Sequence, residues 1–210
     1  MKDKSQFAIA KVMPGELNAL VKNLMSQMKI TDPNEAVRCI NSGEWLVAPA
    51  VSRWREQNSI LYFAVTSHGR TASQWIKYFG KRILPDFVME MLKSPEFRPT
   101  NGVTTEVAVL RGSLYNGRGD LTAKKMFIEG ERRKLERPSA EIACLIAEMF
   151  QSDEITHEMR LSGIIVMHAP IKYDGAGVLF EIGDNSSLTA SVVDNEDVND
   201  HSTGFAFATK

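Results

Sequence analysis

One apolar stripe constrains the fold of this chain more than any other feature. Pro138 is followed by apolar residues at the spacing of a single helix face, namely Ile142, Leu145, Ile146, Met149 and Phe150. Proline is favoured in the first turn of a helix, where its missing N–H costs no hydrogen bond. A complete stripe of this kind is typical of a helix that buries one face. The pattern therefore predicts a core helix that begins near residue 138.

Apolar runs elsewhere in the chain predict a sheet for this helix to pack against. They cover residues 44–51, 59–65, 104–110, 164–168, 178–182, 188–193 and 204–209. The run 59–65 is apolar on both faces, which predicts a central strand. Pro49 places the run 44–51 at a sheet edge or a bulge. We expect an α+β fold with a mixed, mainly antiparallel sheet packed with helices.

The chain length of 210 residues fits a single domain. Two β-rich regions about 120 residues apart nevertheless resemble each other, because Ser42-Gly43 precedes Leu61-Tyr62-Phe63 much as Ser162-Gly163 precedes Leu179-Phe180. One interpretation is a duplication with two similar helix-plus-hairpin lobes, residues 1–93 and 104–210. The other is that both regions are generic helix-and-hairpin units that share one core.

Composition argues against several classes of protein. The formal net charge of −1 is unlike that of a dedicated nucleic-acid binder, so nucleic acid is an unexpected partner. No apolar run approaches the roughly 18 residues of a membrane span, so we expect no membrane partner. The first residues also lack the apolar segment of a signal peptide. These observations predict a cytoplasmic protein.

The thiols and imidazoles of the sequence form no metal-binding motif. Cys39 and Cys144 are far apart in the chain, with no CxxC and no neighbouring histidine cluster. His168 lies in an apolar run and is expected to be a hydrogen-bonded histidine of the core or the sheet face. We therefore expect neither a metal nor a cofactor.

A polar loop follows the run 59–65 and is the first candidate site. Ser67, His68 and Arg70 lie between this strand and a predicted helix that Thr71 or Ser73 caps. A loop that enters a helix N-terminus is a common anion site, and His68 is a candidate acid or base. The alternative is an ordinary polar connection, because the loop lacks the glycines of a phosphate cradle.

Two further clusters are candidate contact surfaces. Arg53, Trp54 and Arg55 lie in a polar segment, residues 53–58, that we interpret as a turn, where an exposed tryptophan between arginines is a candidate protein-contact patch. The basic segment 121–137 is a candidate nucleic-acid contact, in which Lys124, Lys125, Arg132 and Arg133 would contact the phosphates. The alternatives are a core tryptophan and a solvated helix face whose glutamates pair with the cations.

Five segments of the chain are similar to a known group of proteins. They are residues 92–100, 102–110, 138–146, 166–171 and 204–208. Over roughly residues 70–210 the chain thereby resembles a family of uncharacterised bacterial proteins of about this length, which has no assigned function. The resemblance implies a bacterial, cytoplasmic protein and identifies no functional residue.

The residues favour a non-enzymatic binding or protein-interaction module, because no nucleophile, base or metal constellation is recognisable. Its partner is unknown, and a protein is the class we expect. Two alternatives stay open. One is a small hydrolase or transferase with an anion site in the loop from Ser67 to Arg70. The other is a weak nucleic-acid-associated regulator that uses the basic helix near residues 121–137.

Overall fold

The computed structural model describes residues 53–80, 84–115, 121–183, 187–193 and 200–210, together with Met25, Asp32, Asn34, Glu35 and Arg38. The chain separates into two compact units, Met1–Val51 and Ser52–Lys210, and every element discussed below belongs to the second unit. The predicted strand 44–51 lies outside the described residues. The proposed likeness between the lobes 1–93 and 104–210 therefore stays a prediction.

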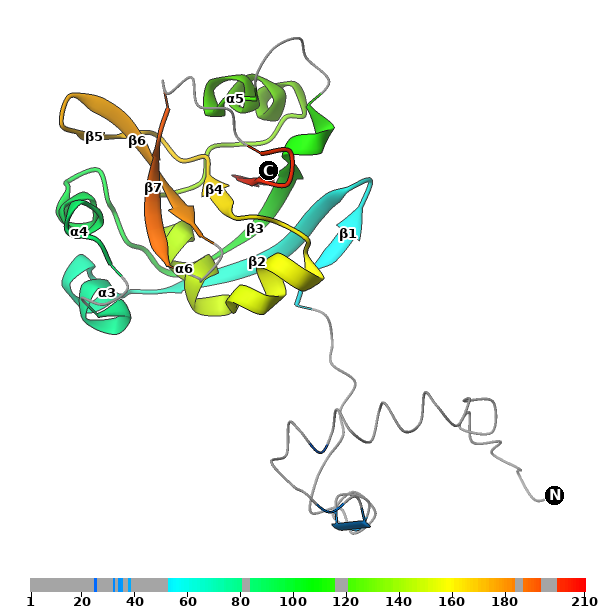
Figure 1. The fold of residues 1–210 in the computed structure, drawn as a ribbon. Helices are drawn as coiled ribbons and strands as arrows, with labels where there is room; N and C mark the ends of the chain where they lie inside the picture. Colours follow the sequence, from blue (N-terminus) through cyan, green and yellow to red (C-terminus); the bar gives the residue numbers. More distant parts are fainter. Residues whose placement is uncertain are drawn as a thin grey trace. The chain divides into compact units, whose positions relative to one another are not determined.

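The second unit is built on one eight-stranded sheet (Figure 1). Its strands are β1 (Arg55–Gln57), β2 (Ile60–His68), β3 (Asn101–Arg111), β4 (Ile164–Val166), β5 (Ile171–Tyr173), β6 (Ala176–Ile182), β7 (Leu188–Val192) and β8 (Gly204–Ala208). The strand order is β1-β2-β3-β8-β4-β6, and β5 and β7 also pair with β6. Of the described strand pairs, β4 with β8 is the parallel one. The predicted α+β class with a mixed, mainly antiparallel sheet is confirmed.

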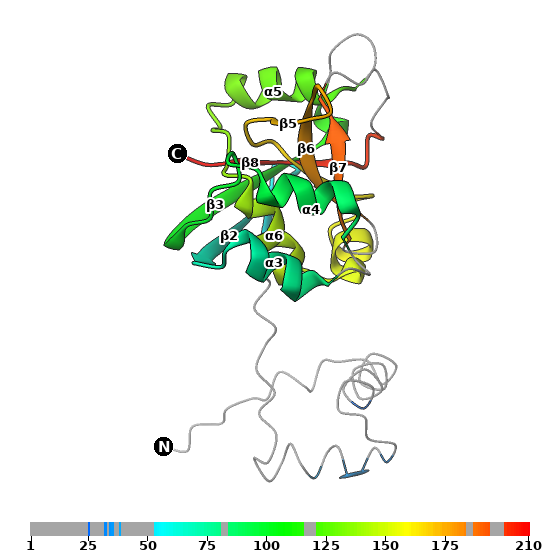
Figure 2. The same ribbon diagram turned by 90° about the vertical axis from the view of Figure 1, so that its left-hand side faces the viewer.

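The helices cover both faces of this sheet. They are α3 (Ala72–Phe79), α4 (Asp86–Lys93), α5 (Ala123–Arg132) and α6 (Glu141–Met149). Thr71 caps α3 through a capping box with Gln74, and the Thr122 side chain accepts a hydrogen bond at the start of α5. Figures 1 and 2 both place α5 on one side of the sheet and α3 and α6 on the other.

Alternate sheet residues enter two separate cores. On β3, Val107 and Val109 pack with α3, α4 and α6, whereas Ala108 and Leu110 pack with α5. Successive side chains of a strand point to opposite faces, so a strand covered on both faces must be apolar at every position. The continuous apolar runs of the sequence therefore correspond to the part of the sheet that lies between helices.

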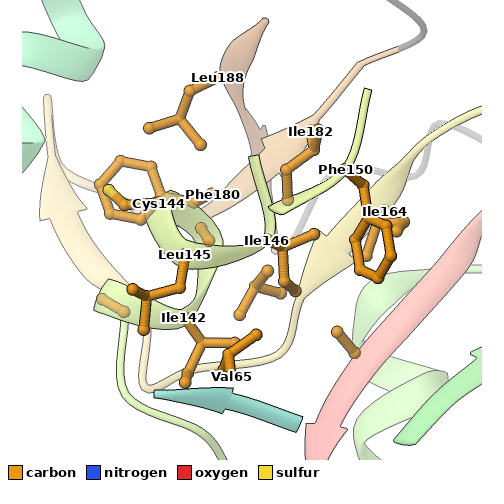
Figure 3. Packing of buried hydrophobic residues seen from close by; sticks show 14 of the residues in the cluster. Val65, Ile142, Cys144, Leu145, Ile146, Phe150, Ile164, Phe180, Ile182 and Leu188 are labelled. Atoms are coloured by element: carbon orange, nitrogen blue, oxygen red, sulfur yellow. The ribbon is translucent and has the colours of Figure 1, made fainter. Parts of the chain in front are cut away.

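Helix α6 lies in the centre of the larger core (Figure 3). Ile142, Leu145 and Ile146 are buried as predicted, whereas Met149 is only half-buried. Cys144, on the side of the helix opposite the apolar stripe, is also fully buried. The helix is thus enclosed over most of its circumference, which the one-sided stripe did not predict.

The segment that we interpreted as a turn, residues 53–58, contains a short edge strand in its second half. Arg55–Gln57 form β1, and the turn itself is only Asn58 and Ser59, with φ values of 54° and 60°. Two residues in this left-handed region form the tight turn whose twist suits a two-residue hairpin. Polarity misled the prediction because an exposed edge strand needs no apolar face.

Strand β2 is not central along its whole length, which corrects the prediction for the run 59–65. On one side it pairs with β3 over its length, but on the other side β1 pairs only with Ile60, Leu61 and Tyr62. Burial of β2 alternates from Phe63 onward, as expected for a strand with one exposed face. The second half of β2 is therefore an edge of the described sheet.

Gly130 in α5 provides a test of the smaller core. A Cβ atom added at Gly130 would lie 2.3 Å from the ring of Phe207, which is itself buried. Alanine normally stabilises a helix by about 1 kcal/mol relative to glycine. Here we expect Gly130→Ala to lower the free energy of unfolding by about 1–3 kcal/mol through overpacking. Urea denaturation measures this, with Glu131→Ala on the exposed side as control; a more stable Gly130→Ala protein would contradict the packing.

Candidate functional site

Among the described residues, the second half of β2 has backbone groups that no strand pairs with on one side. The tight turn makes Gln57 and Ile60 a hydrogen-bonded pair, so the N–H and C=O groups of Ile60 and Tyr62 point toward β1. The backbone N–H and C=O groups of every second residue in a strand point to the same side, so those of Ala64 and Thr66 point in this direction as well. No described strand pairs with them on that side.

Two hollows lie beside this unpaired edge and share Ala64 in their walls. The first, of about 190 Å³, is walled by β2 and by Leu145, Glu148 and Met149 of α6. The second, of about 260 Å³, lies over the Arg53–Arg55 segment, Tyr62 and Glu106. We call the edge from Ala64 to His68, with these two hollows, the β2-edge groove. It combines backbone groups that no described strand pairs with and side-chain pockets.

Ser67 does not face this groove. Its side chain is buried, and its hydroxyl accepts hydrogen bonds from the Val103 N–H at 3.1 Å and from the Thr100 hydroxyl at 2.8 Å. The Glu141 carboxylate, also fully buried, accepts a hydrogen bond from the Thr100 N–H at 2.7 Å. These contacts tie the end of β2 to the loop before β3 and to α6. The position of Ser67 fits a structural role better than ligand binding.

His68 and Arg70 converge on one carboxylate at the far end of the groove. Glu148 of α6 lies 2.8 Å from His68 Nε2 and 2.6 Å from an Arg70 guanidinium nitrogen, each through a different carboxylate oxygen. The Arg70 guanidinium also lies over the rings of Trp75 and Tyr78, at 4.8 Å and 4.3 Å from their centroids. The cation that we expected to attract an external anion is paired with an anion of the chain itself.

The charge of Glu148 is stabilised by these two partners. Burial raises the pKa of the Glu148 carboxyl, but the hydrogen bonds from His68 and Arg70 more than offset this, so the pKa lies below its ordinary value. Glu148 is therefore ionised at neutral pH. Its carboxylate fixes the orientation of the His68 ring and competes with any free anion for Arg70.

Arg53, Trp54 and Arg55 lie at the other end of the groove. Both arginines are exposed; Arg53 forms an ion pair with Glu154, and Arg55 lies 2.7 Å from a Glu106 carboxylate oxygen. Trp54 is half-buried and packs against the larger core. The predicted contact patch thus presents two guanidinium groups and only part of the indole.

The basic face of α5 is largely neutralised by the chain. Arg132 and Arg133 both donate to Glu129, at 2.8 Å and 2.6 Å. The hydrogen bond from Arg132 is the main cause that lowers the pKa of Glu129, so the carboxylate is ionised. Lys125 lies 5.8 Å from the Tyr115 ring centroid, whereas Lys124 is exposed. The described contacts favour a solvated helix face over a phosphate-binding surface.

Two of the three predicted clusters, the loop around His68 and the Arg53–Arg55 segment, lie along the same β2-edge groove, one at each end. The sequence did not identify Glu148, because it is eighty residues from His68 and belongs to a helix recognised only by its apolar face. It also did not identify the edge itself, since backbone groups carry no sequence signal. The third cluster belongs to α5, whose apolar side packs against the other face of the sheet.

Comparison with known proteins adds no relative. No family model matches the chain, and neither a curated protein nor a solved structure shows significant similarity to it. The resemblance to uncharacterised bacterial proteins stays a prediction. Within the described residues, none of the helices has the length and apolar character to cross a membrane. In the same part of the chain, no group of three or more potential ligand residues is placed to hold a metal ion.

Proposed function

We propose that this protein is a non-enzymatic binding module that takes an extended peptide segment of a partner protein along the β2-edge groove. The observation that carries the proposal is the part of the β2 backbone that no described strand pairs with, which lies beside two hollows. Addition of a strand to an exposed sheet edge is a recurring mode of peptide recognition. Backbone hydrogen bonds supply affinity in this mode, and pockets for alternate side chains supply specificity.

The backbone of Ala64 and Thr66 supports a strand as the occupant. Both residues are exposed, and their outward N–H and C=O groups repeat at the spacing of a neighbouring strand. β1 already pairs with the first part of the same edge, so the twist and direction of the edge suit antiparallel pairing. A peptide would pair with β2 beyond Tyr62, next to the point where β1 begins at Arg55.

The walls of the first hollow define the side chain that such a peptide should carry. Val65, Leu145 and Met149 form an apolar surface, and Glu148 closes it at the end nearest His68. An aliphatic side chain would bury apolar area there, at about 25 cal/mol per Å². We infer a partner segment with one aliphatic residue that faces α6 and polar residues at the alternate, solvent-facing positions.

The proposal can be tested with a proline placed on the edge. Full-length protein would first be used to select binders from a displayed library of random peptides, and the affinity of synthetic selected peptides would be measured by fluorescence anisotropy. Thr66→Pro removes an N–H that points away from β3, so the sheet itself should keep its pairing. We expect Thr66→Pro to weaken peptide binding by about tenfold or more.

Thr66→Val is the matched control, because it removes the hydroxyl and keeps the backbone donor. It should bind the selected peptides like the wild type. Equal binding by Thr66→Pro, or selected peptides that shift NMR signals away from β2, would contradict strand addition. Failure to select any peptide would also count against it.

Two other occupants of the edge have different signatures. A dimer that Thr66→Pro dissociates, seen by light scattering, would assign the edge to a second copy of the chain. Strong protection of the Ala64 and Thr66 amides from hydrogen exchange in the free monomer would mean that the edge is already occupied. Either result would overturn the proposal.

The alternative of a small hydrolase or transferase rests on the pair formed by His68 and Glu148. A carboxylate that orients a histidine is one part of a nucleophilic site. Among the described residues, however, no hydroxyl or thiol lies within hydrogen-bond reach of His68. The geometry supports the binding module better, and the enzymatic alternative stays a prediction.

A further inference from the structure

A polar cavity beside β1 shares Trp54 with the walls of the β2-edge groove and is otherwise lined by other residues. Its volume is about 480 Å³, and its walls are Trp54, Glu56, Arg111, Glu158 and Arg160. We propose that this cavity binds a small zwitterion, namely a free α-amino acid. The proposal is independent of the proposed peptide-binding function, because it rests on other charged residues.

Arg111 gives the cavity a fixed positive group. Its side chain is only 15% exposed and donates to the Met159 carbonyl at 2.7 Å and to the Glu56 carboxylate at 3.2 Å. These contacts come from the segment after α6 and from β1, so Arg111 is held between two walls of the cavity. A guanidinium held in this way is ready to bind a carboxylate with little further ordering.

Arg160 adds a cation at the rim whose position is hard to explain by the backbone alone. Its φ of 56° lies in the left-handed region that favours glycine at the end of a helix. Arg160 follows a short π-helix, Glu154–Glu158, whose end is closed by a hydrogen bond from the Leu161 N–H to the Ile155 carbonyl. Among the described residues, neither Arg160 nor Glu158 takes part in an ion pair. Glycine or asparagine would adopt this backbone conformation more easily than arginine. The arginine is therefore best explained by a role of its side chain.

The charges of the walls select the class of ligand. Arg111 and Arg160 are balanced by Glu56 and Glu158. A simple anion would be repelled by the two carboxylates, and a simple cation by the two guanidinium groups. A zwitterion satisfies both, with its carboxylate between Arg111 and Arg160 and its ammonium group at Glu158. Trp54 supplies an aromatic wall for the stem or side chain of the ligand.

The experiment titrates the full-length protein with each free L-amino acid to about 10 mM, a range that detects millimolar affinity. NMR signals of the Trp54 indole N–H and the Arg111 Nε–H report on the cavity. We expect at least one amino acid to shift both signals, and its N-acetyl and C-amide derivatives to bind at least about tenfold more weakly. An N-acetyl derivative that binds as well as the parent would indicate an anion site and overturn the proposal.

A variant of Arg160 separates binding from folding. Arg160→Asn removes the guanidinium group and keeps a residue that tolerates the left-handed backbone. It should lose amino-acid binding by about tenfold or more while the thermal midpoint is unchanged or higher. Arg98→Asn, at an exposed arginine elsewhere, is the matched control and should bind normally. Unchanged binding in Arg160→Asn, or no shift with any amino acid, would overturn the proposal.

Discussion

Replacing Ile146 by alanine is expected to lower the free energy of unfolding by about 2–5 kcal/mol. Ile146 is completely buried on α6, within the larger core and among residues from several strands (Figure 3). The loss combines the transfer free energy of the removed methyl and methylene groups with the cost of the cavity left behind. Because α6 is enclosed over most of its circumference, its surroundings have little freedom to collapse into the space.

Denaturant unfolding at equilibrium would measure this effect. Ile128→Ala is the matched control, since Ile128 lies on α5 with 63% of its surface exposed. The same substitution there should change stability by no more than about 0.5 kcal/mol. A denaturation midpoint for Ile146→Ala equal to that of the wild type would show that α6 is not a core helix.

Lowering the pH from 7.5 to 5 is expected to remove about 2 kcal/mol of stability through His168 alone. His168 is buried, accepts a hydrogen bond from the Phe180 N–H and contacts the Ala169 carbonyl oxygen through Nδ1 at 2.7 Å. Burial lowers the pKa of His168 to about 4, although the hydrogen bond to Ala169 acts in the opposite direction. The imidazole is therefore neutral in the folded protein, as expected for a core histidine.

The direction of the effect follows from proton uptake. Below a pH of about 6.5 the unfolded chain binds a proton at this histidine, whereas the folded protein does so only near pH 4. As the pH falls through this window, the free energy of unfolding therefore drops by about 1.4 kcal/mol for each pH unit. Above the window the neutral imidazole costs the folded protein nothing relative to the unfolded chain. Urea titrations at several pH values would measure the slope.

His168→Gln identifies the source of this pH dependence. Glutamine offers an acceptor near the position of Nε2 and does not titrate, so the variant should lose most of the slope between pH 6.5 and 5. The pKa values of Glu148, Glu154 and Glu129 are lowered by hydrogen bonds and nearby arginines, so their contributions to stability are lost at lower pH than that of His168. An equal slope in the variant and the wild type would exclude His168 as the cause.

Local signals in the sequence predicted most single elements correctly. Thr71 caps α3, as the sequence predicts, because its side-chain oxygen accepts a hydrogen bond from an N–H group of the first turn, an interaction within a few residues. Asp174-Gly175 forms the turn between β5 and β6 with φ values of 47° and 78°, as the residue types indicate. Such features depend on neighbouring residues and are therefore readable without the fold.

The candidate sites were predicted only in part. His68, Arg70 and the Arg53–Arg55 segment were identified by residue type, but their common position along the β2-edge groove depends on where β1 stops pairing. Glu148 was missed because its partners lie in a distant strand. Arg111 and Arg160 carry no local motif, and they meet in one cavity only through the packing of β3 against the segment after α6.

The sequence by itself predicted α6 with its apolar face and most of the described strands, but it did not place the tight turn at Asn58 and Ser59. Backbone propensity, capping and apolar periodicity act over a few residues, so a single chain suffices to reveal them. Only the tertiary structure decided that β2 ends as an edge, that Arg70 is neutralised by Glu148 and that α6 is enclosed on more than one side. These outcomes depend on contacts between residues far apart in the chain, which no local pattern records.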